Sequence, residues 1–432
     1  MSRGPATVSG AITELGPATA RDRLTTSARH YGAPLAVYLL SRVVTTVFIL
    51  VAAPGRVVRM EDLLGYHSAV PARLPADYGS VVTSWDGQWY WDIVLHGYPS
   101  TVVDSGGHAV QSSLAFFPLY PALVKAGMAV TGLGFEVVAP TLSLLLGGAA
   151  VLVVFRLLEV VVDRGRALAC TALLCCFPAT AVLQSAYTES LGLLLVATTL
   201  LLLVRRRYLW CLVPVVLLGL TRNITVVLAP VVVLHWLVAV RQHRRALGDS
   251  PDATAPRPVQ HGRLALLVAV CVAATAEWPL VAGVLTGDPR AYLTTLAAWP
   301  GYSESPLHPP WLGAAGSLGV GGWVGVGVIV LAFAALLGGR TQRAWGPELW
   351  GWTVAYCAYI FMASGATSSL VRYLMLAFPF GLVLMPPAPT AADRRARTWV
   401  VCVFCALELV GQYVWVNQFL VYSGPQGGFG YP

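Results

Sequence analysis

Charged residues are scarce in this sequence. Asp, Glu, Lys and Arg make up only 11% of its 432 residues, whereas apolar residues make up 56%. A soluble domain has about 25% charged residues, so the composition excludes an ordinary soluble fold. The mean hydropathy is +0.68, and uncharged runs such as 141–154 and 191–204 recur along the chain. A helix crosses the bilayer with about 20 mainly apolar residues. The sequence therefore predicts an all-α polytopic membrane protein.

Lysine is nearly absent, since Lys125 stands beside 27 arginines. The net charge of +8 could suggest nucleic acid as a partner. However, the arginines lie in short breaks between apolar runs, where basic residues orient a membrane protein. All eight cysteines lie in apolar segments and lack the paired Cys and His spacing of a zinc site. We therefore expect no nucleic-acid partner, no disulfide scaffold and no zinc site.

The apolar runs divide the chain into a tail, one membrane domain and a short end. Residues 1–30 are polar and rich in small residues, which predicts a disordered cytoplasmic tail. The membrane domain covers 31–421 and contains two long polar segments, about 54–136 and 287–316, and residues 422–432 form an outer tail. The predicted spans are 34–53, 137–162, 167–183, 189–204, 208–221, 224–240, 262–285, 317–338, 348–364, 369–386 and 398–421.

The segment 115–131 decides the orientation. It is apolar but short, and it contains Pro118 and Pro121. If it spans the membrane, the basic breaks 163–166 and 205–207 both fall outside, against the positive-inside rule. If it is re-entrant or lies on the outer surface, every basic break faces the cytoplasm. We adopt this second reading, with about 11 transmembrane helices in the plasma membrane and both long polar segments outside.

The densest polar and aromatic run is 84–99, SWDGQWYWDIVLHGYP. Ser84 is a candidate N-cap, and Gly97 with Pro99 would stop the helix. Its aromatic residues suit a short amphipathic helix in the membrane interface. Asp86 would lie in the first turn, where the helix dipole stabilises a carboxylate. Asp86 can act as a general base there, or it can be only a helix cap beside an aromatic belt.

Three further charged residues stand at the outer ends of apolar runs: Glu189, Arg222 and Arg372. Charges at membrane depth are costly and suggest function by default. The planar fork of arginine suits a phosphate, although both arginines could instead snorkel to lipid head groups. Glu189 could hold an acceptor or cap a span. Arg42, in the first span, is better explained by a structural partner inside the bundle.

These residues resemble a known family, the PIG-V-like mannosyltransferases (GPI mannosyltransferase II and its bacterial relatives), which belong to the GT-C superfamily. The resemblance extends over about 34–386. The motifs that carry it, in the family's order, are Trp85-Asp86, Tyr90, Ile93, His96-Gly97-Tyr98-Pro99, Phe116-Phe117-Pro118-Leu119-Tyr120-Pro121, Phe177-Pro178, Ser185-Ala186-Tyr187-Thr188-Glu189-Ser190, Thr221-Arg222, Arg372-Tyr373 and Phe378-Pro379. The sequence departs from the family at Thr221-Arg222-Asn223, where relatives often have proline or glycine after the arginine.

The resemblance implies a GT-C-like membrane glycosyltransferase, a mannosyltransferase that takes its sugar from a polyprenyl-phosphate donor on the outer face. Because members of the family often work without metal, it also implies a site with no metal and no cofactor. The acidic residue of the first outer loop, Asp86, would be the catalytic base. The candidate substrate-binding residues are Arg222, Arg372, Glu189, Trp89, Tyr90 and His96. The acceptor hydroxyl could belong to a lipid, a glycan or a protein. The alternative is a polytopic transporter or lipid flippase, against which stands the lack of an internal repeat.

Overall fold

The computed structural model describes residues 20–56, 75–248, 258–299, 310–364 and 369–422. Within these ranges the ordered elements are helices, and the only β-type pairing is an isolated bridge between Val103 and Ala109. The α-helices are α1 (Ala20–Ala52), α2 (Tyr78–Val82), α3 (Asp86–His96), α4 (Leu119–Thr131), α5 (Phe135–Leu158), α6 (Arg164–Cys176), α7 (Glu189–Val204), α8 (Tyr208–Gly219), α9 (Leu228–Gly248), α10 (His261–Thr275), α11 (Glu277–Thr286), α12 (Ala291–Ala297), α13 (Pro310–Ser317), α14 (Gly319–Gly338), α15 (Arg340–Arg343), α16 (Gly346–Ala363), α17 (Ser369–Leu374) and α18 (Ala391–Trp415).

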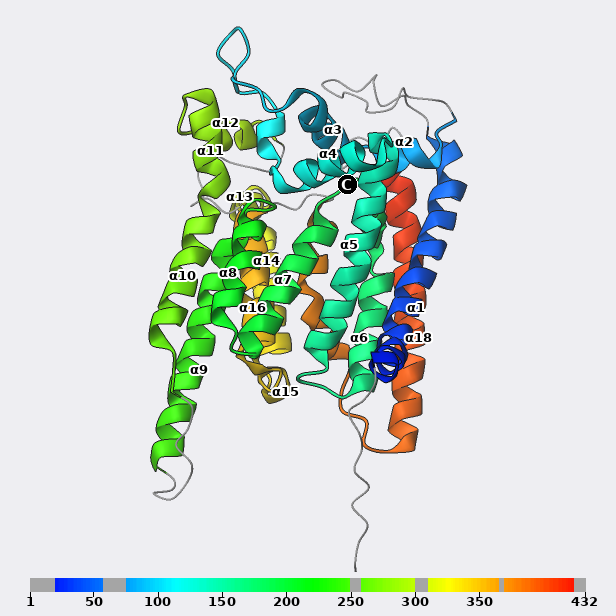
Figure 1. Ribbon diagram of the computed structural model, residues 1–432, viewed down its shortest axis with the longest axis vertical. Coiled ribbons are helices and arrows are strands. Elements are labelled where there is room, and N and C mark those ends of the chain that lie inside the picture. The colour runs from blue at the N-terminus through cyan, green and yellow to red at the C-terminus, as the bar shows by residue number, and fades with distance from the viewer. Residues whose placement is uncertain (1–19, 57–74, 249–257, 300–309, 365–368, 423–432) are drawn as a thin grey trace, which may run out of the picture.

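The described helices confirm an all-α, multi-pass membrane protein. Six of them, counting continuous pairs as one, are long and apolar enough to cross a bilayer, and a bent pair makes a seventh. The shorter apolar helices α7, α8 and α17 with its 3₁₀ extension, together with α16, coincide with the remaining predicted spans. The helices are therefore consistent with the predicted eleven spans. In Figure 1 most of these helices run roughly parallel as one bundle.

The segment 115–131 contains helix α4, which does not have the length of a span. Its 13 residues extend about 20 Å, against a hydrocarbon thickness of about 30 Å. In Figure 1, α4 lies with α2, α3 and α12 at one end of the bundle. This position fits the surface or re-entrant alternative and leaves α4 outside the set of membrane spans.

The two long polar segments lie against each other at that same end of the bundle. The hydroxyls of Ser112 and Thr295 are 2.9 Å apart, and Thr295 also donates to the carbonyl of Val110. The indole of Trp278 donates to the carbonyl of Leu114 over 2.9 Å. Parts of both segments, 57–74 and 300–309, are outside the described residues.

The predicted tail overlaps the first helix. Helix α1 begins at Ala20, ten residues before the end assigned to the disordered tail, so the helix of the first span also includes the mostly polar residues 20–30. Residues 1–19 and 423–432, which hold the rest of that tail and nearly all of the predicted outer tail, lie outside the described residues.

The predicted span 167–183 is broken. Helix α6 ends at Cys176, and the 3₁₀ helix η4 (Pro178–Gln184) leaves it at an angle of 82°. A break exposes backbone carbonyls that must find donors, and the buried guanidinium of Arg42 supplies them. It donates to the carbonyls of Cys175 and Thr180 and to the Thr180 hydroxyl. Arg42 therefore has a structural partner in the bundle, and η4 turns the chain toward residues 185–189.

Candidate active site

Helix α3 carries Asp86 as its first residue. Trp85, not Ser84, occupies the N-cap position, and it does so with a φ of +60°, which is uncommon for a large side chain. Its indole donates to the carbonyl of Leu420 over 2.9 Å. Ser84 instead donates its hydroxyl to the carbonyl of Ser80. The predicted cap residue was therefore wrong, and contact with the last helical segment fixes where α3 starts. Gly97, with φ +79°, ends the helix as predicted.

The start of α3 lies directly against the segment that leads into α7. The amide of Ala186 donates to the carbonyl of Val82 over 2.7 Å. A Cβ on Gly87 would be 3.1 Å from the Cβ of Ala186, so glycine at this position permits the close approach. The resulting contact brings Asp86 beside Glu189, which is the first residue of α7.

Four charged side chains form one cluster here, which we call the charged cluster: Asp86, Glu189, Arg222 and Arg372. Nη1 of Arg372 donates to Oδ2 of Asp86 and lies 3.2 Å from Oε1 of Glu189. Nη1 of Arg222 lies 2.8 Å from the same Glu189 oxygen. The ion pairs thus run from Asp86 through Arg372 and Glu189 to Arg222. All four residues stand at the start, end or break of an apolar run.

Burial differs among the four side chains. Glu189 is fully buried, Arg372 is 5% exposed, Arg222 15% and Asp86 22%. Buried charges are strongly destabilising unless they are paired, and two carboxylates with two guanidinium groups neutralise one another. Asp86 is the most accessible member, so it is the carboxylate that a substrate can reach.

Two tyrosine rings flank the guanidinium groups. The ring of Tyr373 lies 5.4 Å from the guanidinium carbon of Arg222 and 5.2 Å from that of Arg372. The ring of Tyr187 lies 4.9 Å from that of Arg372. Such distances allow cation–π attraction, which holds both planar groups in place. Neither tyrosine was a candidate site residue from sequence, although each is within two positions of one in the motifs.

Further tyrosines on α16 fix the backbone at both arginines. Tyr356 donates to the carbonyl of Tyr373 over 3.0 Å, and Tyr359 donates to the carbonyl of Asn223 over 2.6 Å. No sequence signal selected these tyrosines, because they sit inside a predicted span far from either arginine. Room for the Arg222 side chain comes from Gly192, where a Cβ would be 3.2 Å from Cδ of Arg222.

Trp89 and Tyr90 lie in an aromatic cluster next to the charged cluster. Trp89 stacks on Phe116 with ring centroids 5.7 Å apart. The Tyr90 hydroxyl donates to the Thr188 hydroxyl over 3.4 Å, beside Glu189 in sequence. Both rings are buried. The structure therefore places these two predicted residues next to the charged cluster, where their rings pack beside it.

His96 does not contact the charged cluster. It ends α3, its side chain is exposed, and its Nδ1 lies 2.9 Å from the Asp92 carboxylate one turn earlier. The side chains of His96 and Asp92 are 67% and 36% exposed, against 22% for Asp86. Asp92 consequently offers a matched control for Asp86 on the same helix.

The carboxyl group of Asp86 is held in an unusual electrostatic setting. Burial raises its pKa above the usual value, and the Arg372 guanidinium opposes that shift. A carboxylate with a raised pKa is a stronger base once ionised. In the described parts of the chain, no three His, Cys, Asp or Glu side chains gather as metal ligands would. The cationic groups nearest the carboxylate are Arg372 and Arg222.

No family model and no curated protein matches this sequence significantly. Among solved structures, the chain is similar to an oligosaccharyltransferase from Archaeoglobus fulgidus, with 14% identity and a TM-score of 0.43 over 90% of this chain and 53% of that one. It is also similar to ArnT from Cupriavidus metallidurans bound to undecaprenyl phosphate, with 14% identity and a TM-score of 0.45 over 89% of this chain and 76% of that one. The chain thus spans about half the length of the oligosaccharyltransferase. Likeness at this level leaves the activity to be argued from the chain's own residues.

Proposed function

We propose that this protein is a GT-C-type membrane glycosyltransferase that transfers a sugar from a polyprenyl-phosphate donor to an acceptor hydroxyl. The observation that carries the proposal is the contact between Arg372 and Asp86. It joins a reachable carboxylate, suited to accept a proton, to a buried guanidinium, suited to bind a phosphate. A transfer from a lipid phosphate needs both groups within one site.

The proposed reaction is a single displacement at the anomeric carbon. The acceptor oxygen forms a bond to this carbon while the bond from the carbon to the donor phosphate oxygen breaks. The acceptor proton moves to the Asp86 carboxylate, and the released polyprenyl phosphate keeps the electron pair of the broken bond. Arg372 and Arg222 stabilise the negative charge that develops on the phosphate. Only one carboxylate is required, and the anomeric centre inverts, in contrast to the two carboxylates of a glycosidase.

The contact between Arg372 and Asp86 links donor binding to activation of the base, Asp86. Nη1 of Arg372 donates to Asp86, so the carboxylate is engaged. The donor phosphate is a diester with one negative charge, like a carboxylate, but its two free oxygens match the guanidinium fork, and a second charge develops on it as the bond to the sugar breaks. Donor binding would draw Arg372 toward the phosphate and release the Asp86 oxygen for the acceptor. Glu189, which touches both arginines, would keep them in place during this exchange.

The finer assignments rest on the sequence. The motif resemblance favours mannose as the sugar. The positive-inside distribution of arginines favours the outer face of the plasma membrane for the charged cluster. The acceptor would then be a lipid, glycan or protein of the cell envelope.

The test is sugar transfer by the purified protein in proteoliposomes. Synthetic polyprenyl-phosphate donors carrying different radiolabelled sugars are supplied with a mixture of envelope acceptors, and labelled product is measured. We expect transfer from the mannose donor and none from Asp86→Asn protein. If the protein moves the intact lipid donor between leaflets without forming product, it is a flippase, and the proposal is wrong.

A further inference from the structure

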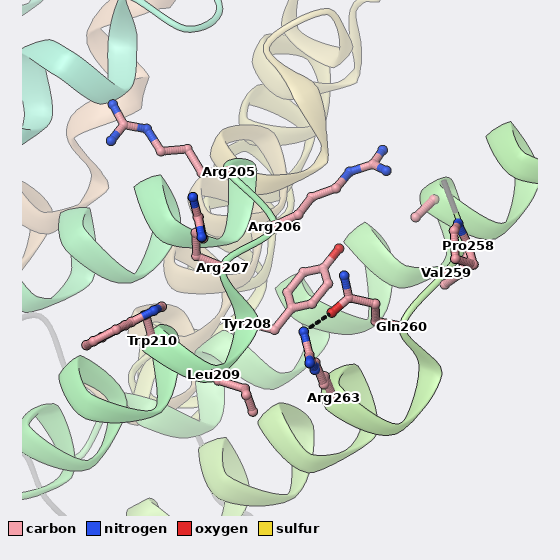
Figure 2. Close-up of a pocket in the computed structure, with 11 residues that line it drawn as sticks. Arg205, Arg206, Arg207, Tyr208, Leu209, Trp210, Pro258, Val259, Gln260 and Arg263 are labelled. Carbon is pink, nitrogen blue, oxygen red and sulfur yellow. Dashed lines mark hydrogen bonds between the residues drawn. The ribbon is translucent and has the colours of Figure 1, made fainter. Parts of the chain in front are cut away.

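A polar cavity lies away from the charged cluster. It has a volume of about 440 Å³ and is enclosed by the turn between α7 and α8 together with the segment that begins α10. We call it the arginine pocket. Its lining residues are Arg205, Arg206, Arg207, Tyr208, Leu209, Trp210, Ala239, Pro258, Val259, Gln260 and Arg263. Figure 2 shows Arg206 above, and Arg263 below, Tyr208 and Gln260.

The pocket has cationic side chains without matching anions. Four of its lining residues are arginines and none is an acid. Among the described residues, none of these arginines forms an ion pair. Among the described residues, one hydrogen bond fixes a guanidinium of the pocket, from Nη1 of Arg263 to the Gln260 side-chain oxygen, 2.7 Å long. Four uncompensated positive charges around one cavity favour an anionic ligand.

A buried polar network lies behind the pocket. The Nδ1 atom of His235 contacts the Glu348 carboxylate, and Nε2 lies 3.0 Å from the Tyr208 hydroxyl. Since a carboxylate only accepts, Nδ1 of His235 donates to Glu348. All three side chains are buried. Tyr208, the first residue of α8, is therefore held in place directly after the arginine run. The positive-inside rule requires only that a cytoplasmic loop be basic. In this loop the residue that follows the arginines, Tyr208, is also anchored to the buried His235 and Glu348.

The surroundings of the pocket indicate a lipid. Leu209 and Trp210, which follow Tyr208 on α8, are both exposed and apolar. In a membrane protein such residues face acyl chains, and tryptophan is enriched at the level of the head groups. The cavity is of the size that encloses a small-molecule ligand. A phosphate beside the arginines with acyl chains along Leu209 and Trp210 would satisfy both kinds of surface.

The pocket belongs to the membrane face opposite the charged cluster. Helix α7 begins at Glu189 of the charged cluster and ends at Val204, next to Arg205. Its 16 residues separate the two sites by about 24 Å along the helix axis. The ligand therefore comes from the other leaflet and is separate from a donor that reaches Asp86.

We propose that the arginine pocket binds the phosphate head group of an anionic phospholipid from the leaflet opposite the charged cluster. The assignment is independent of the proposed transferase activity. Basic pockets between helices on that side recognise anionic head groups through charge and through the guanidinium fork.

The test compares two variants that remove the same charge. Arg206→Gln/Arg207→Gln alters the pocket. Arg244→Gln/Arg245→Gln alters exposed arginines near the end of α9, which lie outside the pocket lining. Each full-length protein, in neutral detergent, is titrated with phosphatidylglycerol, with phosphatidylcholine and with inorganic phosphate, and bound molecules are counted by native mass spectrometry. Size-exclusion profiles show whether each protein is folded, and Arg206→Lys/Arg207→Lys serves as a second pocket variant.

We expect the unaltered protein to retain phosphatidylglycerol in preference to phosphatidylcholine. The glutamine pocket variant should bind it about ten-fold or more weakly, because it loses charge-assisted hydrogen bonds, and the lysine variant should fall between. The α9 variant should bind nearly as the unaltered protein does. Equal binding of the two lipids, or equal losses in both glutamine variants, would show only general attraction to charge and overturn the proposal. Binding of inorganic phosphate as strong as that of the lipid would instead identify a site for a free anion and also overturn it.

Discussion

Arg372 bonds to Asp86, a residue 286 positions earlier in the chain, and the same nitrogen contacts Glu189 at 3.2 Å. The candidate base and the candidate phosphate ligand are therefore direct partners. Because one guanidinium nitrogen is shared by two carboxylates, any anion that binds Arg372 changes the electrostatic setting of Asp86.

Asp86→Asn should reduce turnover by at least about a hundred-fold, the lower end for a positioned base. The amide keeps the shape of the side chain but cannot accept the acceptor's proton. Turnover per folded molecule is measured in the proteoliposome assay. Asp92→Asn, on the same helix but paired with exposed His96, should remain near normal. If purified and folded Asp86→Asn protein turns over normally, Asp86 is not the base.

Arg222→Lys and Arg372→Lys should each weaken donor use by roughly ten- to a hundred-fold, the equivalent of one charge-assisted hydrogen bond. Lysine retains the charge but loses the fork that can grip two phosphate oxygens. The measurement is the donor KM at saturating acceptor. Arg290→Lys, an exposed arginine between α11 and α12, is the control and should change nothing. Unaltered donor KM in both cluster variants would place the phosphate elsewhere.

Glu189→Gln should destabilise the fold by about 3–5 kcal/mol, the cost of leaving buried charges without their partner. Glu189 is fully buried and contacts both arginines. Unfolding is followed in mixed micelles by denaturant titration. Glu136→Gln, an exposed acid in the first turn of α5, should shift stability by less than about 0.5 kcal/mol. Adding Arg222→Gln to Glu189→Gln should restore part of the loss, and no recovery would contradict the pairing.

The acid limb of the rate profile should reflect Asp86. Its base form is lost on protonation, so kcat/KM should fall as pH decreases through its pKa. Burial raises this pKa, so the midpoint should lie above the usual value of about 4. Arg372 opposes the rise, and the residual activity of Arg372→Gln should therefore have its acid limb at still higher pH. If Arg372→Gln leaves the acid limb where it is, or moves it to lower pH, the limb reports the titration of a group other than Asp86.

Cysteine labelling tests the orientation. Ser105, between α3 and α4, and Ala246, near the end of α9, are both exposed. With the native cysteines replaced, Ser105→Cys should react with an impermeant thiol reagent in intact cells. Ala246→Cys should react only after permeabilisation. The reverse pattern would place the charged cluster on the cytoplasmic side.

Several features were predictable from sequence because each depends on residues close together in the chain. Apolar runs interrupted by arginines marked the spans, and Gly97 marked the end of α3. The start of α3 was not predictable, because Trp85 is held at φ +60° by a carbonyl in the last helical segment. The break after Cys176 was also missed, because the guanidinium that satisfies it comes from α1.

By itself, the sequence determined that this chain lies in a membrane and which of its charged residues stand at the ends of apolar runs. Burial in lipid is costly for every unpaired charge, so the positions of Asp86, Glu189, Arg222 and Arg372 already indicated a role. Only the tertiary structure decided that these four meet, that Arg372 is shared by two carboxylates, and that His96 stays apart. Pairing across 286 residues depends on how the helices pack, and local periodicity carries no information about that packing.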